Sequence, residues 1–188
     1  MKTTSINIRR ICLVAMAAAV NVVGGQIALL LRLPVYLDSI GTILVGALLG
    51  PFYGMLPNLL SGICMGLTTD IYSLYFAPAG MVMGLMAGVV FDKMTIKGRW
   101  IFPAALCVTL PSTVISALIS AGLFGGVTSS GSTLLVQLLS KTPLGVVGSV
   151  IAVQILTDYL DRLISIFLVC AILKAMTADM RASLRKEK

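Results

Sequence analysis

Long apolar runs recur along the whole chain, and they restrict the fold more than any other feature. Of the 188 residues, 58% are hydrophobic and only 11% are charged, and the mean hydropathy is +1.03. A water-soluble domain carries charge on roughly a quarter of its residues, which this chain cannot supply. The sequence therefore predicts an all-α integral membrane protein, with residues 1–188 forming a single membrane domain in the cell membrane.

The net charge of +7 comes from basic residues that lie in short clusters beside the apolar runs. This distribution is typical of the cytoplasmic loops of membrane proteins, so we expect a lipid bilayer and no nucleic acid as a partner. The four cysteines stand singly, without the close spacing of a metal site. We expect no metal and no cofactor.

The lengths of the apolar runs predict six helices. A bilayer core needs about 20 helical residues, and the first run supplies them. The turn GPFYG at 50–54 separates a short second helix from the third, because proline cannot continue a helix and glycine permits a reversal. The predicted helices are 11–31, 35–50, 52–69, 79–91, 101–124 and 155–176.

Basic clusters predict the orientation of the chain and decide how its last third is divided. If the basic N-terminus is cytoplasmic, the basic loop 92–99 is cytoplasmic too, and the fifth helix leads to an outer segment, GGVTSSGS. One further crossing returns the basic C-terminal tail to the cytoplasm, whereas two would leave it outside. We therefore expect a compact bundle of six transmembrane helices, both termini cytoplasmic, and an outer-face excursion at about 127–154.

Several kinds of catalysis are excluded by the residues that the chain lacks. It has no histidine, which removes histidine-based triads and proton relays, and it has no phosphate-binding loop for nucleotide hydrolysis. The close carboxylates Asp158 and Asp161 have Arg162 beside them, which indicates a structural ion pair rather than a catalytic pair. We expect the protein not to be an enzyme.

The predicted topology gathers polar side chains at the outer face, where they form a candidate ligand site. Charges at membrane depth usually face a bundle interior or a watery cavity, and aromatic rings beside a few fixed polar groups line small-molecule sites. The alternative is that Arg32 and Asp38 lie at the level of the lipid headgroups. The candidate ligand-binding residues are Arg32, Tyr36, Asp38, Ser39, Asp70, Tyr72, Tyr75, Asp158 and Arg162, with Ser129, Ser130 and Ser132 in the third outer loop.

Small residues spaced by four line one face of several predicted helices. Such a stripe lets another backbone approach closely. For the glycines we expect packing within the bundle; they are Gly46 and Gly50, Gly62 and Gly66, and Gly80, Gly84 and Gly88. For Ala15 and Ala19 on the first helix, internal packing and docking of a partner both remain open.

The passages AMAAAV, LDSIGTILVGALLGPFYG and FAPAGMVMGLMAGVVFDK, in this order, resemble the substrate-binding S components of energy-coupling factor (ECF) vitamin transporters. The resemblance covers nearly the whole chain. It implies a vitamin-binding membrane subunit whose site lies near the outer face, under the loops after helices one and three. It also implies that Ala15 and Ala19 dock on a transmembrane coupling subunit and that two cytoplasmic ATPases drive release.

The vitamin is less closely determined. The long outer connection SSGSTLLVQLLSKTPLG and the few fixed charges favour a bulky, amide-rich neutral ligand, so cobalamin or a related corrinoid comes first. Pantothenate follows, because its carboxylate could pair with Arg32 or Arg162, and folate or a queuosine precursor are further alternatives. Two other classes stay open: a secondary transporter, for which we find no internal inverted repeat, and a membrane scaffold without a ligand.

Overall fold

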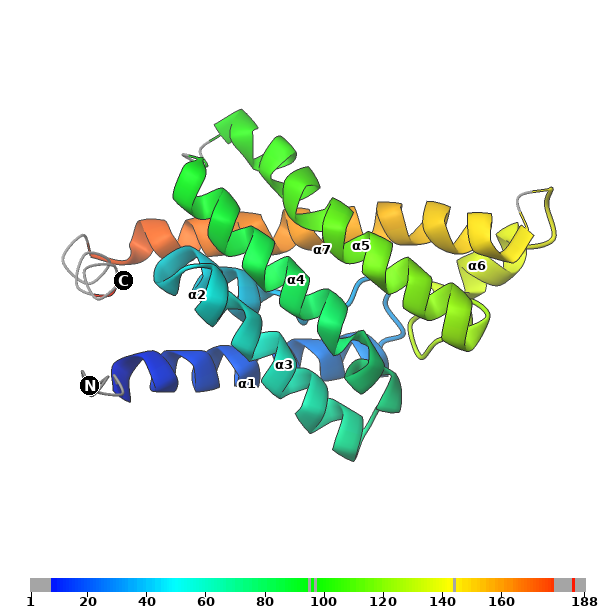
Figure 1. The fold of residues 1–188 in the computed structure, drawn as a ribbon, viewed down its shortest axis with the longest axis horizontal. Coiled ribbons are helices and arrows are strands. Elements are labelled where there is room, and N and C mark those ends of the chain that lie inside the picture. The colour runs from blue at the N-terminus through cyan, green and yellow to red at the C-terminus, as the bar shows by residue number, and fades with distance from the viewer. Residues whose placement is uncertain (1–7, 95, 97, 144, 178–183, 185–188) are drawn as a thin grey trace, which may run out of the picture.

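The computed structural model describes residues 8–94, 96, 98–143, 145–177 and 184, and this part of the chain is all-helical, as predicted (Figure 1). Several basic residues used to orient the chain, among them Lys2, Lys97 and Arg181, lie outside the described residues. The elements are α1 (Ile8–Leu30), α2 (Ile40–Leu49), α3 (Pro51–Thr68), α4 (Ile71–Lys93), the 3₁₀ turn η1 (Gly98–Trp100), α5 (Ile101–Phe124), α6 (Thr133–Leu139) and α7 (Gly145–Ala175).

Three helical stretches of the described chain are long and apolar enough to cross a membrane: Ile8–Leu30, Ile71–Lys93 and Gly98–Phe124. They fit a multi-pass membrane protein. The helix α2 has 10 residues and rises about 15 Å, half of a bilayer core of about 30 Å. The helix α7 is the longest, with 31 residues, but it carries charged side chains in its middle. Length and composition thus support three of the six predicted spans.

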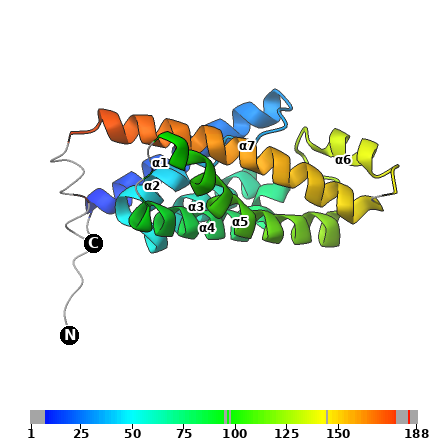
Figure 2. The same cartoon turned by 90° about the horizontal axis from the view of Figure 1, so that it is seen from above.

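The short helix α2 lies at the centre of the bundle. It packs against α1, α3, α4 and α7, and its side chains Ile43 and Val45 are completely buried. Ile43 belongs to an apolar core with Met83 of α4, Val108 of α5 and Ile166 of α7. In both Figure 1 and Figure 2 the first turn of α1 and the last turn of α7 lie at one end of the bundle, and α6 lies at the other.

Glycines let α2, α3 and α4 pack with their backbones in contact, as the four-residue spacing predicts. A methyl group on Gly54 would collide with the carbonyl oxygen of Gly84, and one on Gly84 would collide with that of Gly54. The predicted turn is also confirmed, because Gly50 has a φ of 94° and Pro51 opens α3. The glycines on these helices therefore serve internal packing.

Three helices begin at least five residues away from their predicted starts. The helix α4 begins at Ile71 rather than at 79, because Pro78 lies inside it without breaking it, as neighbouring helices allow in a membrane bundle. The helix α2 begins at Ile40 rather than at 35, so the residues before it are free to reach into the bundle. The helix α7 begins at Gly145 rather than at 155, so much of the predicted excursion at 127–154 is helical.

Candidate functional site

The segment between α1 and α2 is drawn into the bundle by one buried carboxylate. Asp161, completely buried in the middle of α7, accepts a hydrogen bond from the backbone N–H of Leu37 (2.8 Å) and one from the hydroxyl of Ser39 (2.5 Å). Leu37 is held at a φ of 53°, which is uncommon for a residue with a Cβ atom. The polar residues that precede the short helix α2 therefore lie inside the protein.

Asp161 also forms the predicted ion pair with Arg162, which is confirmed. The Nη1 atom of Arg162 contacts Asp161 and donates a hydrogen bond to the Ser39 hydroxyl at 3.0 Å. Asp158 is engaged separately, since its Oδ2 atom accepts a hydrogen bond from Thr113 of α5 at 2.7 Å. The buried Nε atom of Arg162 has no hydrogen-bond partner among the described residues.

A cavity with several charged and polar side chains in its wall lies between these groups and the neighbouring helices. Its wall comes from α1, α3, α4, α5 and α7 and from the segments 31–39 and 125–132, and its volume is about 80 Å³. Six of the nine predicted ligand-binding residues line it: Tyr36, Asp38, Asp70, Tyr72, Asp158 and Arg162. These six residues come from three separate stretches of the sequence and meet around one space.

The other three predicted ligand-binding residues do not line the cavity. Arg32 is exposed, with its backbone held at a φ of 48°. Tyr75 is 47% exposed and packs edge-on against Phe124, with ring centroids 5.3 Å apart. Ser39 is completely buried behind the wall, where it binds Asp161 and Arg162.

Polar lining residues inside the predicted helices were missed from sequence. The signal that could have found them is a polar side chain within an apolar run, which in a membrane bundle usually faces the interior. Asn58 shows the pattern, since its side chain contacts the cavity and its amide donates to the backbone carbonyl of Asp38 at 3.4 Å. The missed lining residues of this kind are Asn58, Ser61, Ser112 and Ser116.

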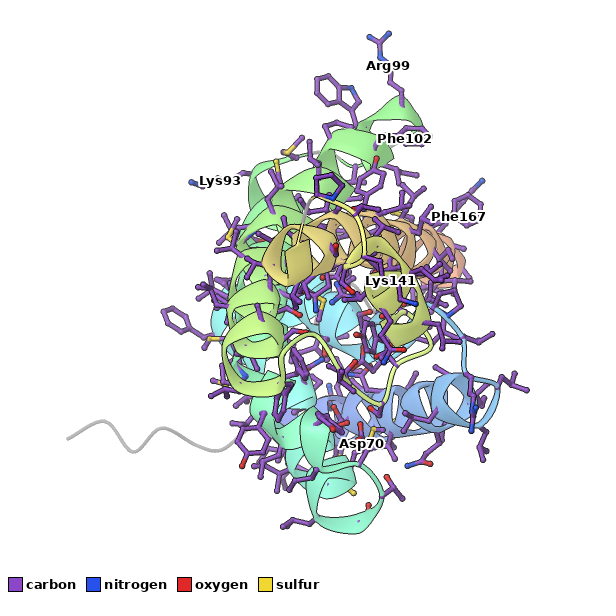
Figure 3. The ribbon with its side chains drawn as sticks, turned by 90° about the vertical axis from the view of Figure 1, so that its right-hand side faces the viewer. Asp70, Lys93, Arg99, Phe102, Lys141 and Phe167 are labelled. Carbon is purple, nitrogen blue, oxygen red and sulfur yellow. The ribbon has the colours of Figure 1, made fainter. Side chains whose placement is uncertain are left out.

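The segment 125–132, which we term the cap, lies at the α6 end of the bundle and contributes Thr128, Ser129 and Ser130 to the cavity wall (Figure 1). Ser129 of the cap donates a hydrogen bond to the Oδ2 atom of Asp70 (2.8 Å), which also accepts one from Ser73 (3.0 Å). Figure 3, seen from the α6 end, shows Asp70 close to the cap, whereas Lys93 and Arg99 point away from the bundle. The cap is thus tied to the start of α4.

Burial changes the acid–base properties of the two ionisable residues between α1 and α2 that line the cavity. It raises the pKa of Asp38 from 3.8 to about 6; nearby Arg162 opposes the shift, whereas Asp161 and Asp158 add to it. Burial also raises the pKa of Tyr36 to about 12, against hydrogen bonds from Ser130 and Ser132. Asp38 is therefore mostly ionised at neutral pH but takes up a proton readily.

The predicted docking residues lie on the outside of α1. Ala15 and Ala19 are exposed, while α1 packs on its neighbours through Val14, Ala17 and Ala18. The side chains of Ala15 and Ala19 therefore leave a shallow, exposed part of α1 where another helix backbone could approach.

No protein-family model matches the chain, and comparisons with curated proteins and with solved structures give no match. The cavity and the residues around it are therefore the features of the chain that indicate a function.

Proposed function

We propose that this chain is the substrate-binding membrane subunit of a vitamin importer, of the S-component kind found in ECF transporters. The observation that carries the proposal is a cavity inside an apolar bundle whose wall contains Asp38, Asp158 and Arg162 and residues of the cap. Ionised side chains at membrane depth cost free energy unless they pair or bind something. Holding a polar small molecule accounts for their presence in this wall.

The arrangement of the helices supports six spans, formed by α1 to α5 and α7, with α6 and the cap at the outer face. The start of α1, the end of α7 and the α4–α5 connection share one half of the bundle (Figure 1). These ends carry Arg9, Arg10, Lys93, Arg99 and Lys174, and a cluster of basic residues favours the cytoplasmic side. The cavity then lies in the outer half, where an importer would collect its substrate.

The size of the cavity favours a ligand smaller than a corrinoid. A cavity of about 80 Å³ is smaller than the roughly 300–1,000 Å³ of typical small-molecule sites, so its wall would have to move more for a corrinoid than for a smaller vitamin. Cobalamin, which the sequence places first, would therefore require the largest rearrangement. Pantothenate, folate and a queuosine precursor are the smaller alternatives.

A binding subunit of this kind works with partners. Exposed Ala15 and Ala19 on α1 would meet a transmembrane coupling subunit, because small side chains allow close packing between helices in lipid. Two cytoplasmic ATPases would supply the energy, so this chain would hydrolyse no ATP and catalyse no reaction itself.

Equilibrium dialysis of a labelled vitamin panel against the purified full-length chain tests the proposal. The panel includes cobalamin, pantothenate, folate and a queuosine precursor. We expect one compound to bind at one molecule per chain, and to bind more weakly when Asp158→Asn alters the cavity wall. If the well-folded chain binds no vitamin at all, the binding-subunit proposal fails and a scaffold role replaces it.

A further inference from the structure

If the cavity binds a small molecule, as proposed above, the charges in its wall restrict which kind. Asp38, Asp70, Asp158 and Arg162 line it. The positive charge of Arg162 is already taken by its ion pair with Asp161, which lies behind the wall and is completely buried. The lining therefore presents more negative than positive charge to whatever enters.

The hydrogen-bonding capacity of the wall is also incomplete. Thr113 donates to Oδ2 of Asp158, but no side chain among the described residues donates to the carboxylate of Asp38. Among the donors, the buried Nε–H of Arg162 has no acceptor among the described residues. This is notable because the Arg162 side chain is more than nine-tenths buried. A bound molecule would need donors facing Asp38 and Asp158, and one acceptor facing Arg162.

The rest of the lining suits a flat ring. Tyr36, Tyr72 and Phe76 line the cavity, and aromatic rings attract organic cations. A metal ion is a poorer match, because no three acidic, cysteine or histidine side chains of the described chain come together as a metal site. The acidic side chains of the wall instead come from separate segments around the cavity.

We infer that the cavity takes a small organic cation, a protonated nitrogen attached to a flat ring that also carries a hydrogen-bond acceptor. The cationic nitrogen lies toward Asp38 and Asp158, and the acceptor lies toward the Nε–H of Arg162. A simple carboxylate anion is disfavoured, since it would meet a surplus of carboxylates and an arginine that is already paired.

A matched set of one-ring probes tests this inference on the purified full-length chain by calorimetry. 3-(Aminomethyl)pyridine carries an ammonium group and a ring acceptor, 3-pyridinemethanol is its neutral counterpart, nicotinate is an anion, and benzylamine lacks the ring acceptor. We expect 3-(aminomethyl)pyridine to bind about tenfold more tightly than the neutral alcohol, the size of one charge-assisted hydrogen bond. Benzylamine should bind more weakly than 3-(aminomethyl)pyridine, and nicotinate weakest of all.

Variants locate the site of binding. Asp158→Asn and Asp38→Asn should each remove most of the tenfold preference for the ammonium probe, and leave 3-pyridinemethanol almost unaffected. Asp92→Asn, the same change on an exposed residue at the other end of α4, should preserve the preference. Circular dichroism checks that each variant is folded. If Asp158→Asn does not fold, the test is made with Asp38→Asn, because Asp38 lies outside the helices.

The outcomes separate this inference from the proposed function. The inference of a cationic ligand is wrong if nicotinate binds more tightly than the ammonium probe. It is also wrong if the folded chain binds none of the probes. In either case a vitamin that binds in the dialysis panel and loses affinity in Asp158→Asn would keep the binding-subunit proposal. If neither the probes nor the panel bind, both fail.

Discussion

Replacing Asp161 by asparagine should destabilise the folded chain more than any other single polar change in the bundle. This carboxylate is completely buried and holds three groups at once: the Leu37 N–H, the Ser39 hydroxyl and the Arg162 guanidinium. Asparagine keeps one acceptor oxygen but places an NH₂ group where the second oxygen accepted hydrogen bonds. The guanidinium then loses its direct counter-charge.

The expected cost is about 3 kcal/mol, the lower end of the range for breaking a buried ion pair by removing one partner. The lower end applies because a second carboxyl group, that of Asp158, lies on the same side of α7, one turn before Arg162. Ser165→Ala is the matched control. Ser165 is also completely buried, but its only side-chain contact of this kind among the described residues is a long one, 3.5 Å between its oxygen and that of Ser39. We expect this control to cost less than about 1 kcal/mol.

The assay is reversible unfolding in mixed micelles, followed by the loss of helical circular dichroism as sodium dodecyl sulfate is increased. A double variant, Asp161→Asn with Arg162→Gln, should recover at least half of the loss, because no buried charge is left without its partner. If Asp161→Asn costs less than about 1 kcal/mol, or if the two changes simply add, the ion pair does not hold the α1–α2 segment in place.

Four further predictions follow from the same structure. Reporter fusions should place the α4–α5 connection and the C-terminal tail in the cytoplasm and the cap outside; a tail outside would contradict six spans. Ala15→Leu or Ala19→Leu should abolish uptake but preserve ligand binding by the solubilised chain, whereas a parallel loss of binding would point to internal packing. Asp38→Ala or Asp70→Ala should weaken binding of the ligand found in dialysis by about ten- to hundredfold, while Asp92→Ala should leave its dissociation constant unchanged. Because burial raises the pKa of Asp38 to about 6, the folded chain holds this proton more tightly than the unfolded chain. The contribution of Asp38 to the free energy of unfolding should therefore decrease as the pH rises from about 4 to about 6. This decrease should be absent when the free energy of unfolding of Asp38→Asn is measured over the same pH range.

A helix could be predicted from sequence where its ends depend only on the length and apolar character of its own segment. The prediction for α5 matches the structure at both ends, and the glycine–proline turn before α3 is confirmed. The start of α4 was predicted eight residues too late, at 79, although Pro78 lies inside the helix without ending it. Whether a proline ends a membrane helix depends on the neighbouring helices, which the local sequence does not contain.

The candidate site could be predicted only in part, because its geometry depends on one long-range contact. Tyr36 and Asp38 line the cavity because Asp161, more than a hundred positions later, holds the backbone at Leu37. Arg32 is exposed and has a positive φ, and neither property can be deduced from the residue type. Asn58 could have been identified, since an amide within an apolar run needs a partner inside the bundle.

The most direct test of the small-molecule site fills the cavity and measures what is lost. Ser116 of α5 lines the cavity, and a phenylalanine at this position would occupy part of the space of about 80 Å³. For the compound that binds in dialysis, titration calorimetry should show one-to-one binding to the wild-type chain. The dissociation constant should be at least tenfold larger for a folded Ser116→Phe variant. Unchanged affinity in that variant would mean that the ligand binds elsewhere, and would contradict the assignment of this cavity as the binding site.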